Sequence, residues 1–306
     1  MPLRAMRTAI PPTATRAARV LPGRIGGIDD LDATDALELL GKAPAPASAA
    51  RLTRGQIAAA LRNARRRDIE TKTARIQTAL RGEQLGRTAV ITTAYARILL
   101  AEDSEEAAAG LQITGALFPF WSFRGTYGEA RSWIGRVLNH SARQPVPDRV
   151  KVLCVGCVMA AMQGDLQDAA AMLEQGRVEA EQALSPTALV HISFGDGVLA
   201  LYRGELTAAF EAYARAAEGF SSNRAGSFYV AALTLLGWIR ESAGDTQQAI
   251  AYHRQVLAIA EACGELLFRS GALRDLGVGV WREGERSKAI ELVEDALRVN
   301  QRMEAR

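Results

Sequence analysis

Glycine recurs from residue 125 onward at a nearly constant interval of 40 residues. The glycines lie at Gly125, Gly164, Gly204, Gly244 and Gly284. An alanine follows each of them five residues later, at Ala130, Ala169, Ala209, Ala249 and Ala289. A fixed period of this size is typical of chains built from repeated supersecondary units, which stack to share one continuous core.

Each repeat predicts a turn between two antiparallel helices. Glycine adopts the positive φ of such a turn at little cost. An acidic residue comes next and can cap the following helix, at Asp165, Glu205, Asp245 and Glu285. We expect the alanine to face the first helix, where only a small side chain allows close approach. The matching small residue on that helix precedes the turn by seven residues, at Cys157, Gly197, Gly237 and Gly277.

The composition agrees with an all-α fold. Aromatic residues make up only 6% of the chain, and alanine is abundant, which favours closely packed helices. No apolar run is long enough to span a bilayer, and three cysteines give no disulfide framework, so we expect a cytoplasmic protein. Residues 1–28 are rich in arginine and proline, and we expect a disordered arm there.

The small residue, turn glycine and alanine resemble the tetratricopeptide repeat. A large residue nine positions after the turn also fits, at Ile134, Leu173, Tyr213 and Val293, whereas His253 departs from it. This resemblance implies a right-handed α-solenoid of antiparallel helix pairs, with about five repeats over residues 105–306. The usual period is about 34 residues, so a 40-residue period indicates longer helices or longer connections between repeats.

The longer period and the string LQITGALFPFWSFRGTYGEARSWIGRVL resemble the helical array of bacterial LuxR-type regulators that carry an ATPase. In those regulators the array follows a nucleotide-binding domain and precedes a DNA-binding domain. No GxxxxGK[ST] loop occurs in this chain, so we expect it neither to bind nor to hydrolyse ATP.

Residues 29–100 form a second, helical segment in which Thr53 can cap a helix. The segment resembles the middle of DEDD-type insertion-sequence transposases. The aspartates Asp29, Asp30, Asp32 and Asp35 are interpreted as an acidic helix start rather than a metal site. The two resemblances together indicate a junction of two gene fragments near residues 98–106.

No constellation of residues indicates catalysis, and we expect no enzyme activity, cofactor or metal. Cys154 and Cys157 form a CxxC that falls inside an expected helix among apolar residues, which favours a packing role over zinc or redox chemistry. The three histidines lie far apart in the sequence and show no metal-ligand spacing.

A basic stretch over residues 50–80 allows two interpretations. One is a solvated helix face, and the other is weak, salt-dependent contact with nucleic acid without sequence preference. The arginines that would make this contact are Arg62, Arg65, Arg66 and Arg67.

The function predicted for the array is binding of a protein or peptide in a groove lined by the first helices of the pairs. Repeat register directs toward this groove Lys151, His191, Phe194, Tyr202, Trp238, Glu241, Arg274, Trp281 and Arg282. For Phe194 and Trp281 the alternative is a place in the core. The rival functions are a DNA-associated transposase remnant and a fusion product without function.

We also expect an exposed apolar strip at the C-terminal edge, near residues 290–303. The strip would contain Ile290, Val293, Leu297 and Met303. Because each repeat buries its apolar face against the next, an array needs a polar terminal cap. An uncovered strip predicts either self-association from edge to edge or low solubility. The alternative is that Arg298, Arg302 and Arg306 solvate the edge.

Overall fold

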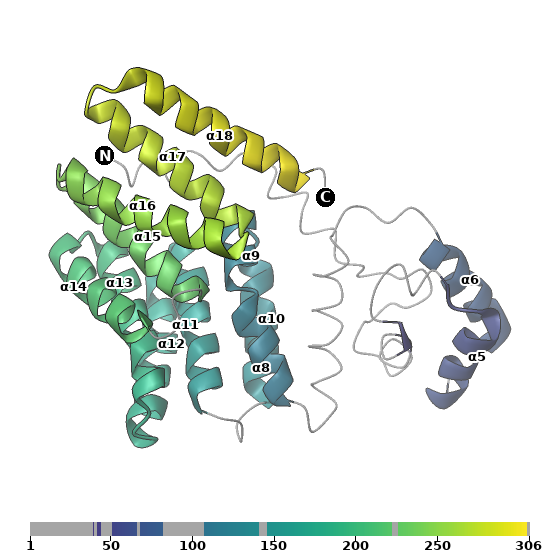
Figure 1. The fold of residues 1–306 in the computed structure, drawn as a ribbon. Helices are drawn as coiled ribbons and strands as arrows, with labels where there is room; N and C mark the ends of the chain where they lie inside the picture. Colours follow the sequence, from purple (N-terminus) through teal and green to yellow (C-terminus); the bar gives the residue numbers. More distant parts are fainter. Residues whose placement is uncertain are drawn as a thin grey trace. The chain divides into compact units, whose positions relative to one another are not determined.

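The computed structural model describes residues 39, 42, 43, 51–65, 68–81, 107–140, 146–221 and 226–304. Thirteen α-helices and no strand occur among these residues, which confirms the predicted all-α class (Figure 1). Contacts divide the chain into two compact units, with the boundary between Val152 and Leu153. The expected arm at residues 1–28 and the junction at residues 98–106 fall outside the described ranges.

The first unit begins with two short helices, α5 (Arg54–Asn63) and α6 (Ile69–Arg81). Thr53 starts α5 as predicted, because its hydroxyl accepts a hydrogen bond from the backbone N–H of Gln56 at 3.3 Å. The Gln56 side chain accepts one in return from the backbone N–H of Thr53 at 2.9 Å. The two helices share a small apolar cluster, which contains Leu39, Ala43, Leu52, Ile57, Ala60, Leu61 and Ile76.

Three further helices follow in this unit, α8 (Ala107–Ala116), α9 (Phe118–Arg124) and α10 (Tyr127–His140). One continuous helix was expected before the turn at Gly125, and the structure has two. The break at Leu117 comes just before Pro119, whose ring removes a backbone donor and favours the first turn of a new helix. This break raises the number of helices between α8 and α18 to eleven, one more than the pairing predicts.

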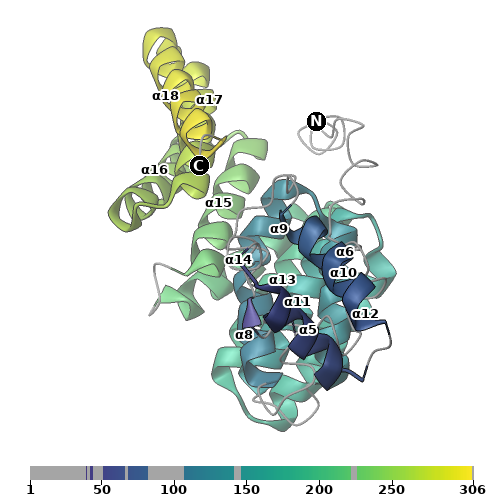
Figure 2. The same cartoon turned by 90° about the vertical axis from the view of Figure 1, so that its right-hand side faces the viewer.

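Antiparallel helix pairs continue along the chain, and in Figure 2 the last pair lies beside the pair that precedes it. The helices are α11 (Val146–Met162), α12 (Leu166–Gln182), α13 (Pro186–Arg203), α14 (Leu206–Gly219), α15 (Ser227–Ser242), α16 (Thr246–Cys263), α17 (Leu266–Arg282) and α18 (Arg286–Glu304). Most have 16 to 19 residues. Long helices therefore account for most of the 40-residue period.

The turns have the predicted conformation, although only part of the predicted capping forms. All five repeat glycines have positive φ, between 68° and 90°. Asp165 and Asp245 each accept a hydrogen bond from a backbone N–H in the first turn of the next helix. Glu205 makes no such bond, and Glu285 instead pairs with Lys288 at 3.3 Å. Capping by these two glutamates was therefore wrongly predicted, although a glutamate can cap a helix here, since Glu265 accepts hydrogen bonds from two backbone N–H groups at the start of α17.

The close approach within three of the pairs, α13–α14, α15–α16 and α17–α18, depends on a glycine of the first helix, whereas α11 has Cys157 at this position. A Cβ atom built on Gly197 would lie 2.7 Å from the Tyr213 ring, and one on Gly237 would lie 2.4 Å from the His253 ring. On Gly277 it would lie 2.8 Å from Val293. The large residue nine positions after the turn thus occupies the space that a side chain would need. The predicted need for a small residue on the first helix is confirmed, but the side chain opposite Gly197 and Gly237 is this large residue and not the alanine.

We expect Gly237→Ala to lower the free energy of unfolding by about 1–3 kcal/mol, because the new methyl group overpacks against His253. The matched control is Gly271→Ala in α17, where a Cβ would meet no atom within 4 Å. This change should leave stability unaltered or raise it by up to about 1 kcal/mol through helix propensity. Thermal and urea denaturation measure both variants, and equal effects would contradict the packing argument.

Candidate partner-binding groove

The inner helices α15 and α17 bring four of the predicted groove residues together. These residues are Trp238, Glu241, Arg274 and Arg282. Trp238 and Arg274 both contact a fifth residue that sequence reasoning did not identify, Asp275, whereas Glu241 and Arg282 pair with each other. The signal of Asp275 in the sequence was a carboxylate that follows Arg274 inside the string LRDLGVGV, which is apolar apart from these two residues. An acid in such a string is worth noting, because buried carboxylates need hydrogen-bond or charge partners.

Asp275 is buried and has partners for both carboxylate oxygens. Its Oδ2 accepts a hydrogen bond from the indole N–H of Trp238 at 2.8 Å. Its Oδ1 accepts from Nε of Arg274 at 2.9 Å and lies 2.8 Å from Nη2 of the same guanidinium. The carboxylate therefore links α15 to α17 and orients the Arg274 side chain, which is more than half exposed.

Glu241 and Arg282 form the second contact of this cluster. Nη1 of Arg282 lies 3.3 Å from Oε1 of Glu241 and donates to the backbone carbonyl of the same residue at 3.3 Å. Burial raises the pKa of Glu241, the positive charge of Arg282 lowers it in part, and the nearby charge of Asp275 raises it further. About half of the Arg282 side chain stays exposed.

This geometry suits recognition of acidic groups. Each arginine is held from one side by a carboxylate, while the rest of its guanidinium faces solvent. A guanidinium has five N–H donors in a fixed plane, which match the two oxygens of a carboxylate. Arg274 and Arg282 are eight residues apart on α17, about 12 Å along the helix axis.

Phe194 and His191 on α13 are buried and do not line a groove. Phe194 is 1% exposed and contacts the rings of Tyr213 and Phe228 at 5.3 and 5.0 Å. The His191 ring meets Phe220 and Phe228, each at 4.9 Å between ring centroids. The expectation that these two side chains face a partner is therefore corrected, because aromatic residues of α14 and α15 cover them.

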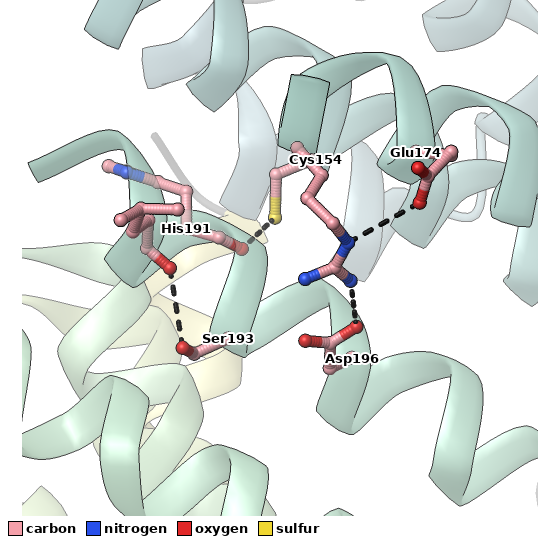
Figure 3. A network of polar contacts seen from close by, with 7 residues as sticks. Cys154, Glu174, His191, Ser193 and Asp196 are labelled. Atoms are coloured by element: carbon pink, nitrogen blue, oxygen red, sulfur yellow. Dashed lines mark hydrogen bonds and ion pairs between the residues drawn. The ribbon is translucent and has the colours of Figure 1, made fainter. Parts of the chain in front are cut away.

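A polar network ties α11, α12 and α13 together (Figure 3). The Cys154 thiol donates to the backbone carbonyl of His191 at 3.1 Å. Arg177 of α12 pairs with Asp196 of α13 at 2.6 Å and with Glu174 at 3.3 Å. Burial raises the pKa of Cys157 to about 12 and that of Cys154 well above its usual range, so both thiols stay protonated packing residues.

The other three predicted groove residues differ in their surroundings. Lys151 packs along α8, where a Cβ on Gly115 would lie 2.9 Å from its Cε. Burial lowers the pKa of Lys151, and Asp148 partly offsets this effect. Tyr202 on α13 is exposed, and so is Trp281 on α17, which has the Arg286 guanidinium 5.4 Å from its ring centroid. Trp281 is therefore not a core residue.

The basic stretch is described only in part. Arg62 and Arg65 are exposed, and Arg62 shares a shallow hollow of the α5–α6 pair with Arg54. Arg66 and Arg67 fall outside the described residues. Contact with nucleic acid stays a prediction. In the described ranges, no three His, Cys, Asp or Glu residues are placed to hold a metal ion, and none of the helices could span a membrane.

We expect Asp275→Ala to lower the free energy of unfolding by about 1–3 kcal/mol, because it leaves the Trp238 N–H without its acceptor. The matched control is Asp295→Ala on α18, which removes an exposed carboxylate paired with Arg298. Exposed pairs of this kind contribute little, so the control should unfold like the unchanged chain. A thermal midpoint that shifts equally in both variants would contradict a structural role for Asp275.

His253 should make the array less stable in acid. Its pKa is lowered by burial, the charge of Asp275 opposes this effect, and Arg274 adds to the lowering. Both ring nitrogens are buried without a hydrogen-bond partner. Below a pH of about 6.5 the unfolded histidine binds a proton that the folded one does not. Stability is therefore complete above that pH and is lost as the pH falls through it.

We expect the thermal midpoint to fall between pH 7.5 and pH 5.5, and to fall less in a His253→Leu variant. Carboxylates titrate in both proteins, so the difference between the two pH profiles isolates His253. Parallel profiles would show that this ring is protonated equally in the folded and unfolded states.

Comparisons with known proteins agree with this repeat architecture. A model of the tetratricopeptide repeat matches residues 232–267, which cover most of α15 and all of α16. BtubC (BKLC) from P. vanneervenii has a similar structure, with 18% sequence identity and a TM-score of 0.51. The similarity covers 72% of this chain and 94% of that one. No match was found among curated proteins.

A second similar structure is a Signal Transduction ATPase with Numerous Domains (STAND) protein with a tetratricopeptide repeat sensor, from Pyrococcus horikoshii. It has 13% identity and a TM-score of 0.50, and the similarity covers 82% of this chain. This chain spans only 41% of that protein. At these identities the similarities concern the fold alone. Together with the matched repeat, they show that this chain carries a tetratricopeptide-like array of helix pairs.

Proposed function

We propose that this chain is a protein-interaction module that binds an acidic segment of another protein along α15 and α17. It acts by binding and performs no chemistry of its own. The observation that carries the proposal is the pair of anchored arginines, Arg274 and Arg282. Each is oriented by an acidic residue, Asp275 or Glu241, and each keeps part of its guanidinium exposed to solvent.

Anchoring matters because a flexible arginine loses side-chain freedom when it binds a ligand. In this cluster a large part of that freedom is already lost in the unbound protein. Trp238 is a half-buried aromatic side chain beside this cluster and is itself fixed by its bond to Asp275. Aromatic and arginine side chains dominate the binding energy of most protein interfaces.

The distance between Arg274 and Arg282 limits which spacing of acidic residues in a partner peptide can contact both side chains. Two carboxylates that contact them would lie about 12 Å apart. An extended peptide rises about 3.3 Å per residue, so the matching acidic residues would be about four positions apart. A segment with isolated acidic residues would engage only one arginine and bind more weakly.

We further propose that the array derives from the sensor or scaffold part of a bacterial regulator. The resemblance to LuxR-type regulators motivates this origin, and a STAND protein with a tetratricopeptide sensor shares the fold. The transposase-like origin proposed for residues 29–100 depends on sequence resemblance alone.

Selection of random dodecapeptides on phage tests the proposed function. Peptides that bind the full chain should be enriched in two acidic residues about four positions apart. Their dissociation constants, measured by fluorescence anisotropy, should rise at least about tenfold in an Arg274→Ala/Arg282→Ala variant, or about 1.4 kcal/mol. The control Arg298→Ala removes an exposed arginine of α18, whose side chain pairs with Asp295, and should bind like the unchanged chain.

Affinity should also fall as salt is added, because exposed charges are screened. Enrichment of neutral or basic peptides would contradict the proposal. So would acidic peptides that bind the double arginine variant as tightly as the unchanged chain.

A further inference from the structure

Helix α17 covers a defined face of the preceding pair, α15 and α16. The residues of this face are Trp238, Glu241, Ile250, His253 and Leu257. Trp238 donates a hydrogen bond to Asp275 of α17, and Glu241 forms an ion pair with Arg282 of α17. Ile250 lies against Gly279, where an added Cβ would come within 2.7 Å of its side chain. Leu257 packs against apolar residues of α17 and α18.

The same face recurs 40 residues later on α17 and α18. Its residues are Val278, Trp281, Ile290, Val293 and Leu297. No helix among the described residues covers it, and α18 is the outermost helix of its stack in Figure 1. Ile250 is 4% exposed, whereas Ile290 is 54% exposed. Trp281 and Leu297 are 52% and 55% exposed. The expected apolar strip near residues 290–303 is therefore present at Ile290, Val293 and Leu297, whereas Met303 is only partly exposed.

The chemistry of the two faces differs at three positions. Trp238, Glu241 and His253 of the covered face correspond to Val278, Trp281 and Val293 of the uncovered one. The covered face needs a specific partner, because Glu241 and Trp238 require a cation and an acceptor opposite them. The uncovered face has no charged side chain, and the indole N–H of Trp281 is the one polar group of its five side chains, so an identical face brings no unpaired charge against it.

The surroundings of the uncovered face would not keep two copies apart. The segment from residue 282 to residue 302 has no net charge. Its basic residues are Arg282, Arg286, Lys288, Arg298 and Arg302, and its acidic residues are Glu283, Glu285, Glu291, Glu294 and Asp295. Several of these charges are paired within α18, including Arg298 with Asp295 at 2.6 Å. Repulsion between like charges is therefore small when two such faces meet.

We propose that the face formed by Val278, Trp281, Ile290, Val293 and Leu297 packs against the same face of a second copy of this chain. Twofold symmetry makes such a contact self-complementary and closed, which limits assembly to a dimer. Burial of contiguous apolar surface supplies the driving force. The dimer interface lies on the outer face of α17 and α18, whereas the arginine cluster joins α17 to α15.

Sedimentation velocity of the full chain between 1 and 100 μM tests the proposal. The expected result is a concentration-dependent transition from monomer to dimer. Leu297→Gln should raise the dissociation constant of the dimer at least tenfold, and Ile290→Gln/Leu297→Gln should give a monomer throughout. The matched control is Leu184→Gln, which changes a leucine that is 85% exposed in the turn between α12 and α13.

Circular dichroism should show unchanged helix content and thermal midpoint in all variants diluted to 1 μM, since the substituted side chains are exposed. A monomer at 100 μM would overturn the proposal. So would a dimer that the double variant leaves intact, because another surface would then form it. Masses that increase beyond the dimer with concentration would overturn twofold pairing and indicate head-to-tail contact.

Discussion

In the three pairs α13–α14, α15–α16 and α17–α18, the distance between the two helices is set by a large side chain that lies directly over a glycine. Tyr213 occupies this place over Gly197, His253 over Gly237 and Val293 over Gly277. Because no Cβ intervenes, the helix axes can approach closely, and the alanine five residues after the turn is buried in the same interface. Repetition of this contact every 40 residues gives successive pairs the same shape, so that each can stack on the next.

When one helix pair stacks on the next, polar side chains at the interface are buried and need hydrogen-bond or charge partners from the neighbouring pair. The covered face of α15 and α16 contains an indole, a carboxylate and an imidazole, and α17 supplies partners for the first two. Asp275 and Arg282 meet Trp238 and Glu241 across this interface. These contacts orient two arginines on the inner helices, which makes the interface between repeats also the proposed binding surface. His253 receives no such partner, and its burial connects the stability of this interface to pH.

At the last pair the same face is apolar and exposed. Valine and tryptophan at the positions that correspond to Trp238, Glu241 and His253 remove the need for a complementary charge. A surface of that kind is costly to leave in water. Within the second unit, one repeated geometry therefore supports two kinds of surface, a charged one between neighbouring inner helices and an apolar one on the final pair.

Local sequence pattern determined the helices, their turns and the residues that pack within a pair. A positive φ favours glycine, and a close approach requires a small residue. Both requirements repeat about every 40 residues, so they can be recognised in the sequence. Pro119 also marked the break between α8 and α9, although periodicity alone pointed to one helix.

The tertiary structure decided which side chains of the inner helices stay exposed. Phe194 and His191 are covered by rings from α14 and α15, and Asp275 finds Trp238 37 residues away. Whether one of these side chains is exposed or covered depends on contacts between successive repeats, which are distant in sequence. The pattern of residues within a single repeat carries no information about those contacts.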